Sequence, residues 1–165
     1  MPPKKLTYRD VRTYASISLD AIRRNGVVAK EIFPDQKILS VLKADAYGHG
    51  IAGVLSAYET FTDWYAVATV EEALEIRKVS KKPVLLFGPV PEYQMVLAAQ
   101  TGLTFTVGSF DYGCRLSDAM KAAGIVAECH LKIDTGLNRS GIRWRENCEA
   151  LNEIQMLHQC EGLTF

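Results

Sequence analysis

Neither sign of charge is in excess in this sequence, which has 19 Lys and Arg residues and 19 Asp and Glu residues among 165. The balance removes the electrostatic reason to expect a nucleic acid or an anionic membrane as the partner. A long apolar run is also lacking, and none follows the first five residues, MPPKK, so we expect neither a secretory signal nor a transmembrane span. The hydrophobic content of 48% is average for a packed domain, and we expect a cytoplasmic globular protein.

Closely spaced cysteines are lacking as well. The chain has four cysteines, no two of which form a CxxC pair: Cys114, Cys129, Cys148 and Cys160. Because this spacing is not that of a metal site, we expect no metal and interpret the four as reduced thiols that mostly pack in the interior.

A lysine ends the first apolar segment. Residues 38–42 (ILSVL) alternate as a strand with apolar side chains on both faces, which is typical of a parallel strand covered on both sides. Lys43 breaks this pattern on the face of Leu39 and Val41, and it opens the glycine-punctuated run 43–50 (KADAYGHG). Ligands bind at the C-terminal ends of strands in open α/β sheets and in barrels alike.

The position of Lys43 at the end of an apolar strand favours a chemical role for its amine. Taking an ammonium out of water costs several kcal/mol, so a buried lysine tends to lose its proton or gain a covalent or charged partner. Both outcomes suit a lysine that forms a Schiff base with an aldehyde cofactor. The alternative is a lysine whose charged end reaches solvent just past a strand.

A second segment, residues 130–141 (HLKIDTGLNRSG), begins as a strand and ends in a glycine-rich turn. Strand alternation predicts three ionisable side chains on one face: His130, Lys132 and Asp134. Such a face cannot belong to an ordinary core, and Arg139 just beyond the strand is the candidate partner for these charges. The alternative is a half-exposed edge strand with a solvated polar face.

Three segments in the same order resemble the alanine racemase family, the fold-type III enzymes that use pyridoxal 5'-phosphate (PLP). Residues 43–50 resemble the family's cofactor-lysine signature almost residue for residue, and residues 132–141 resemble its second signature. Residues 14–25 are similar to the family's opening strand and helix.

The resemblance implies roles for four residues. Lys43 would hold PLP as an internal aldimine and act as one of two acid/base groups at the α-carbon of the amino acid. Tyr47, one helical turn further on, would contact the cofactor phosphate, although an aromatic packed at a strand–helix junction is the alternative. Arg139 would hydrogen-bond the phenolic oxygen of PLP, and Lys132, carbamylated in some members, would position that arginine. His49 is expected to cap or flank a helix start outside the site.

Strand and helix signals alternate along the chain at intervals typical of a parallel α/β fold. We expect strands near residues 38–43, 64–68, 83–87, 103–107 and 126–134, with a sixth beginning at 162–165. A complete (β/α)8 barrel needs about 200 residues at the least and typically about 250. The chain is therefore predicted to hold five βα units and the start of a sixth strand of a parallel (β/α)8 TIM-type barrel.

The helices have local signals of their own. We expect a leading helix over residues 18–33, and a capping box of Thr69 and Glu72 predicts a helix that runs to about Val79. Pro91 suits the first turn of a further helix. Gly102 and Gly124 each follow a helical stretch and are placed as C-terminal caps.

The resemblance extends to the whole protein. It implies that residues 1–165 are the N-terminal part of a PLP-binding barrel, that the C-terminal β-domain with the opposing tyrosine lies beyond Phe165, and that this part alone is inactive. The complete protein would be a homodimer that interconverts L- and D-alanine, a small-molecule substrate, and supplies D-alanine for cell-wall peptidoglycan. The alternatives are a racemase for serine or another amino acid, a PLP carrier without racemase activity, and a scaffold without a ligand.

Overall fold

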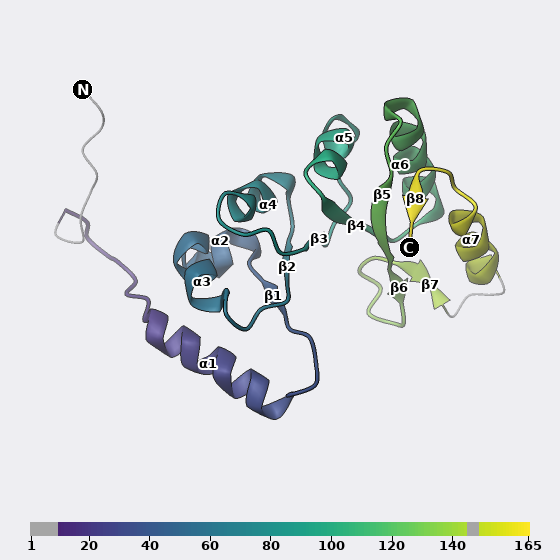
Figure 1. Cartoon of the computed structure of the whole chain (residues 1–165). Helices are drawn as coiled ribbons and strands as arrows, with labels where there is room; N and C mark the ends of the chain where they lie inside the picture. The colour runs from purple at the N-terminus through teal and green to yellow at the C-terminus, as the bar shows by residue number, and fades with distance from the viewer. Residues whose placement is uncertain (1–9, 145–148) are drawn as a thin grey trace, which may run out of the picture.

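The computed structural model describes residues 10–144 and 149–165, in which strands and helices alternate after a leading helix (Figure 1). The helices are α1 (Leu19–Ile32), α2 (Lys43–Gly48), α3 (Ile51–Tyr58), α4 (Val70–Arg77), α5 (Glu92–Gln100), α6 (Phe110–Ala123) and α7 (Glu149–His158). The strands are β1 (Leu39–Val41), β2 (Trp64–Val67), β3 (Val84–Leu86), β4 (Leu103–Val107), β5 (Ala127–Leu131), β6 (Ile133–Asp134), β7 (Ile142–Arg143) and β8 (Leu163–Thr164).

Six of the strands form one parallel sheet in the order β1-β2-β3-β4-β5-β8. The two short strands β6 and β7 pair with each other after β5. Sequence order and spatial order agree along the main sheet, as they do in a barrel wall built from successive βα units. The predicted α/β architecture, an incomplete parallel (β/α)8 barrel with a sixth strand at its end, is confirmed.

The sheet is strongly curved. Trp64 on β2 and His130 on β5 approach with ring centroids 5.4 Å apart, although β3 and β4 lie between their strands. In a flat sheet these two strands would lie about 14 Å apart, because neighbouring strands are about 4.8 Å apart. The two side chains therefore meet across the concave face.

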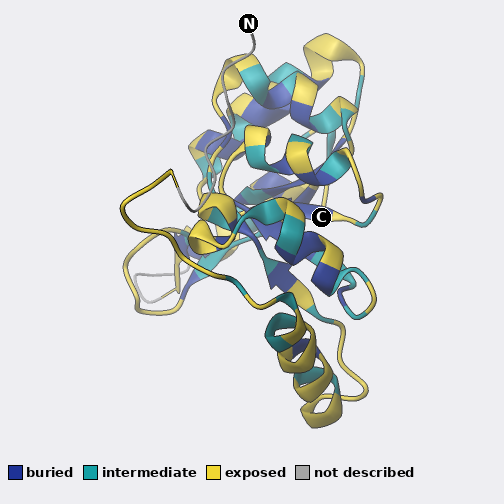
Figure 2. Ribbon diagram, turned by 90° about the vertical axis from the view of Figure 1, so that its left-hand side faces the viewer, coloured by how far each residue is buried: buried dark blue, intermediate teal, exposed yellow. Residues whose placement is uncertain are grey.

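The helices cover the convex face, and the main core lies between them and the sheet. Tyr65, Val84 and Phe105 from three neighbouring strands are fully buried there, and each such side chain contributes roughly 1.5–3 kcal/mol by its burial. Figure 2 shows the buried residues on the strands and on the helix faces turned toward them, whereas α1 projects with much of its surface exposed. On the concave face Leu39 is 38% exposed, so the prediction that residues 38–42 are covered on both faces is wrong for this side of β1.

The helix signals in the sequence are confirmed. Ser18 caps α1 by accepting a hydrogen bond from the backbone N–H of Ala21 at 3.2 Å. Thr69 and Glu72 form the complete capping box of α4, although the helix ends at Arg77, earlier than expected. The helices after Pro91 and Ser109 end next to glycines in the left-handed region: Gly102 (φ 67°) and Gly124 (φ 66°).

Three of the four cysteines lie in the part of the chain that the structure describes, and all three are free thiols. Cys129 is buried, and this burial raises the pKa of its thiol to about 12. Cys114 and Cys160 are half-buried, whereas Cys148 lies outside the described residues. Within residues 10–144 and 149–165, no helix is long and apolar enough to cross a membrane.

Candidate functional site

A cleft of about 770 Å³ opens at the C-terminal ends of the parallel strands. The four residues predicted for the site all line it: Lys43, Tyr47, Lys132 and Arg139. They come from two segments far apart in the sequence, one after β1 and the other after β5. The structure thus brings the four candidate residues together in one place.

The segment that carries Lys43 has an unusual backbone. Four residues after Lys43 have left-handed helical dihedrals, with φ between 53° and 56° and ψ between 38° and 48°: Ala44, Asp45, Ala46 and Tyr47. None is glycine, and left-handed geometry costs such residues roughly 1–2 kcal/mol each. Tyr47 therefore follows Lys43 by a left-handed turn, and the prediction of an ordinary helical turn between them is wrong. We call residues 44–47 the left-handed turn.

Contacts from three directions support the left-handed turn. The N–H of Ala44 donates to a carboxylate oxygen of Glu72 on α4 at 2.6 Å. Asp45 accepts a hydrogen bond from the backbone N–H of Ile51 at 2.7 Å, which ties the turn to the start of α3. Ala46 is buried, and its N–H donates to the carbonyl of Leu42. These contacts offset part of the backbone strain.

The side chains of Lys43 and Tyr47 meet in the cleft. The Nζ atom of Lys43 lies 5.8 Å from the centroid of the Tyr47 ring, within the range of a cation–π interaction. Tyr47 is 62% exposed, so it is not the packed aromatic of the alternative interpretation. Lys43 is half-buried, which leaves its amine available to a ligand in the cleft.

The second segment leaves the main sheet at Lys132. The N–H of Lys132 still donates to the carbonyl of Val107 on β4 at 2.8 Å, but the carbonyl of Lys132 accepts from the N–H of Ile142, the first residue of β7, at 2.9 Å. The expected continuous strand over 126–134 is therefore wrong beyond Leu131, where β5 ends. The cause is that a new partner, β7, takes over the pairing.

This break changes the role of Asp134. His130 and Lys132 line the cleft, but Asp134 is buried and accepts hydrogen bonds from the N–H groups of Gly136 at 2.9 Å and Asn138 at 3.1 Å. These donors hold the pKa of Asp134 below its ordinary value. The prediction that His130, Lys132 and Asp134 share one face is wrong for Asp134, whose partners are backbone N–H groups.

A glycine lets the segment fold back toward β4. Gly141 has φ 122°, and a Cβ atom there would lie 2.8 Å from the backbone nitrogen of Asp134. On its other side Gly141 approaches Gly108, where a Cβ atom would lie 3.3 Å from it. The positive φ and the 2.8 Å approach require a glycine at position 141, and the fold places Arg139, which is exposed, at the rim of the cleft.

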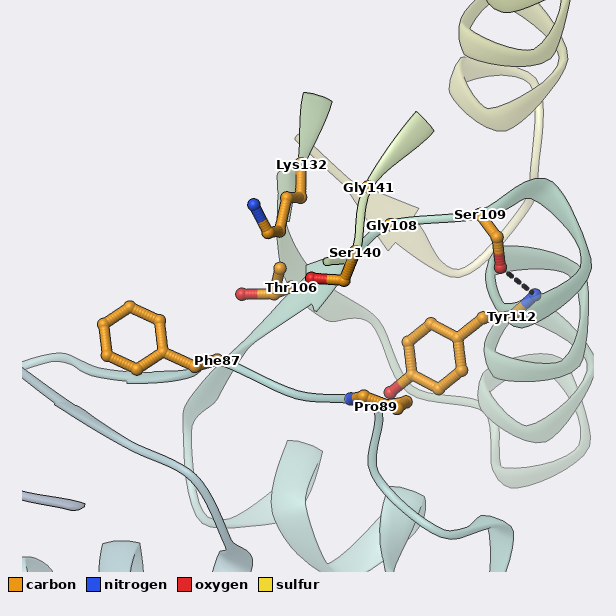
Figure 3. A pocket seen from close by; sticks show the side chains of 9 residues that line it. All are labelled: Phe87, Pro89, Thr106, Gly108, Ser109, Tyr112, Lys132, Ser140 and Gly141. Atoms are coloured by element: carbon orange, nitrogen blue, oxygen red, sulfur yellow. Dashed lines mark hydrogen bonds between the residues drawn. The ribbon is translucent and has the colours of Figure 1, made fainter. Parts of the chain in front are cut away.

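A smaller cavity of about 200 Å³ adjoins the cleft (Figure 3). The residues shared by both are Phe87, Thr106, Lys132 and Ser140. Tyr112 closes the cavity on the side of α6, where its hydroxyl oxygen accepts a hydrogen bond from the N–H of Val90 at 2.9 Å. Burial raises the pKa of this phenol, so Tyr112 stays neutral at physiological pH.

Sequence reasoning did not single out Phe87, Thr106 or Glu72 for the site. Phe87 and Thr106 lie at the C-terminal ends of β3 and β4, and that position was the signal that could have identified them. Glu72 was recognised as a capping residue only. His49, expected outside the site, lies two residues after the left-handed turn, and its Nδ1 atom lies 3.3 Å from the carbonyl oxygen of Tyr47.

Comparisons with known proteins point to one family. Residues 17–165 match the family model described as the N-terminal domain of alanine racemase. The chain is 38% identical over 154 residues to alanine racemase 2 of Caldanaerobacter subterraneus subsp. tengcongensis, a match that covers 92% of this chain and 39% of the relative.

Solved structures agree with this match. The alanine racemase of Clostridium difficile 630 superposes with a TM-score of 0.81 at 33% identity, covering 89% of this chain and 39% of that one. A histidine racemase from Leuconostoc mesenteroides superposes with a TM-score of 0.76 at 27% identity, covering 88% of this chain and 39% of that one. The chain thus spans about 39% of the length of these relatives.

Proposed function

The chain belongs to the alanine racemase family, and on that premise we propose that the complete protein interconverts L- and D-alanine with PLP as its cofactor. One observation carries the proposal: a single cleft is lined by Lys43, Tyr47, Lys132 and Arg139. We further propose that residues 1–165 are the N-terminal part of the barrel domain, that a C-terminal β-domain completes the protein, and that it acts as a homodimer in the cytoplasm.

The cleft fits PLP in size and in chemistry. Its volume of about 770 Å³ lies within the roughly 300–1,000 Å³ of small-molecule sites. The side chains that line it include a half-buried primary amine for the aldehyde, and a phenol and a guanidinium for the anionic groups of the cofactor. This donor set supports the assignment of PLP.

Each residue has a distinct task in the proposed reaction. The amine of Lys43 would hold the cofactor covalently and, once the amine of the substrate has displaced it, would remove or return a proton at one face of the α-carbon. Tyr47 would bind the phosphate, Arg139 would donate hydrogen bonds to the phenolic oxygen, and Lys132 would position Arg139. When bound, PLP supplies an electron sink that lowers the cost of removing the α-proton.

Racemisation also requires a second acid/base group on the opposite face of the α-carbon. Our proposal assigns this group to the tyrosine of the C-terminal β-domain that the family resemblance implies. Residues 1–165 by themselves then hold one of the two groups and would not racemise an amino acid.

A different amino acid is the second candidate substrate. The histidine racemase of Leuconostoc mesenteroides shares the fold with a TM-score of 0.76, which supports the view that this scaffold accommodates more than one substrate. A PLP carrier without racemase activity stays a third alternative.

Activity measurements on the full-length protein distinguish these candidates. We expect PLP-loaded protein to form D-alanine from L-alanine and the reverse, with exchange of the α-proton for deuterium in D2O. Serine and histidine, assayed in parallel, are expected to react more slowly. Faster turnover of serine or histidine would identify that amino acid as the substrate in place of alanine. Bound PLP without racemisation of any amino acid would contradict the enzyme proposal in favour of a carrier.

A further inference from the structure

The left-handed turn after Lys43 contains no glycine. Its four residues would each gain by returning to a right-handed or extended backbone. Such geometry persists only where surrounding groups determine it, so the side chains that contact the turn also determine where Lys43 points.

Glu72 makes such a contact from another element. One of its carboxylate oxygens, Oε1, accepts a hydrogen bond from the N–H of Ala44, the first residue of the turn, at 2.6 Å. The other oxygen, Oε2, accepts from the N–H groups of Ala68 at 2.9 Å and Thr69 at 3.3 Å. An ionised carboxylate has about four acceptor positions and can serve all three donors at once.

The two oxygens of Glu72 connect two neighbouring segments of the cleft wall, one after β1 and the other after β2. Ala68 lines the cleft just after β2, and Lys43 lines it just after β1. Glu72 therefore ties the residue next to Lys43 to the end of the neighbouring strand. Its place in the first turn of α4 also suits a carboxylate, because the positive end of the helix dipole lies there.

Helix capping alone does not account for this arrangement. A capping box requires only that the Glu72 side chain accept from the N–H of Thr69, and that contact is the longest of the three, at 3.3 Å. The shortest, at 2.6 Å, goes to Ala44. The shortest hydrogen bond of the carboxylate is thus made to the turn that directly follows the lysine.

We propose that Glu72 is a positioning residue for Lys43. Glu72 holds the left-handed turn so that the amine of Lys43 points into the cleft. The inference rests on the proposed function, in which Lys43 attaches the cofactor and moves a proton. Without Glu72, the N–H of Ala44 loses its acceptor and the turn is free to relax, which displaces both Lys43 and Tyr47. Displacement of a reacting group by about 1 Å can cost on the order of a hundredfold in rate.

The test uses the full-length protein with Glu72→Ala and two matched controls. Glu71→Ala removes a neighbouring carboxylate that accepts from Gln94 at 2.5 Å, on α5. Thr69→Ala removes the hydroxyl that accepts from the N–H of Glu72 at 3.3 Å, and so weakens the cap of α4 while leaving the contact to Ala44 in place. Glu72→Gln keeps one acceptor oxygen in place of two and serves if the alanine variant does not fold.

Two readouts are measured for each variant. In the apoprotein, amide hydrogen exchange of the peptide covering residues 43–50 should quicken by about tenfold or more in Glu72→Ala and by an intermediate factor in Glu72→Gln. In the PLP-loaded enzyme, kcat should fall by about tenfold to a hundredfold while KM for alanine changes by less than about threefold. Glu71→Ala should match the unaltered protein, and Thr69→Ala should lower Tm without slowing turnover.

Unchanged exchange of residues 43–50 in Glu72→Ala would overturn the inference. An equal loss of kcat in Thr69→Ala would also overturn it, because Glu72 would then act only as a cap. Attachment of PLP to a residue other than Lys43 would instead contradict the proposed function, and the exchange measurement on the apoprotein would still report whether Glu72 holds the turn.

Discussion

Two carboxylates hold the two segments that bring cationic side chains into the cleft. Glu72 accepts from the N–H of Ala44 beside Lys43, and Asp134 accepts from the N–H groups of the turn just before Arg139. Both carboxylates accept hydrogen bonds from backbone N–H groups, and Lys132 also contributes to the lowered pKa of Asp134. The two carboxylates therefore fix the backbone that carries the cations of the cleft.

Arg139 is expected to matter for turnover. If it donates to the phenolic oxygen of PLP, Arg139→Ala in the full-length enzyme should lower kcat by about a hundredfold, the scale of losing one donor at a centre of developing charge. PLP affinity should fall less. Arg115→Ala on α6, which removes an exposed guanidinium paired with Glu92 and Asp111, serves as the control. Unchanged turnover in Arg139→Ala would show that this arginine is only a solvated residue at the rim.

Asp134 gives stability a pH dependence of known sign. Backbone N–H donors lower the pKa of Asp134 in the folded state. Its contribution to the free energy of unfolding is therefore present above the ordinary carboxyl pKa, and it is lost as the pH falls through the lower pKa of the folded state. Asp134→Asn should lower Tm at pH 7, and the difference from the unaltered protein should shrink in acid. Thermal unfolding of both full-length proteins across pH 2–7 checks this, and a pH-independent difference would contradict it.

At the scale of helices and strands, local signals predicted most of the architecture. The capping box at Thr69 and the signals for a strand near residues 103–107 are local, and they predicted α4 and β4. The left-handed turn could not be predicted, because Ala and Tyr have no preference for that geometry and distant contacts, such as that of Glu72, impose it. The end of β5 was missed for a similar reason, since the pairing of Ile133 with Ile142 sets it.

The packing of α1 on α3 offers a matched pair of glycine substitutions. A Cβ atom at Gly26 would lie 1.8–2.4 Å from ring atoms of Phe61, whose ring packs edge-on against Tyr58. Gly26→Ala should therefore destabilise the full-length protein by about 1–3 kcal/mol, since overpacking outweighs the gain in helix propensity. A Cβ atom at Gly53 would meet Leu19 at an ordinary 3.4 Å, so Gly53→Ala should be neutral or stabilising by up to about 1 kcal/mol. Equal effects on thermal unfolding would contradict this packing.

At the scale of the whole molecule, the described sheet is open, with β1 and β8 at its edges. Trp64 and His130 meet on its concave face, which the helices do not cover. Large apolar side chains of α1 and the residue after it are also more than half exposed: Val27, Ile32 and Phe33. Open strand edges and apolar surface of this kind favour association with further protein.

Residues 1–165 expressed alone should therefore self-associate, and they should not form D-alanine, because the proposed function assigns the second acid/base group to another part of the protein. Size-exclusion chromatography and an assay for D-alanine test the two halves of this prediction together. A compact monomer that makes D-alanine would contradict it, and would mean that a complete site exists within these residues.

Reductive trapping tests most directly whether Lys43 attaches the cofactor. Full-length protein is loaded with PLP, reduced with borohydride, digested and analysed by mass spectrometry. We predict the pyridoxyl label on the peptide containing Lys43, its loss in Lys43→Ala, and its retention in Lys132→Ala, which removes the other lysine that lines the cleft. A label on Lys132, or one that persists at full yield in Lys43→Ala, would contradict the account.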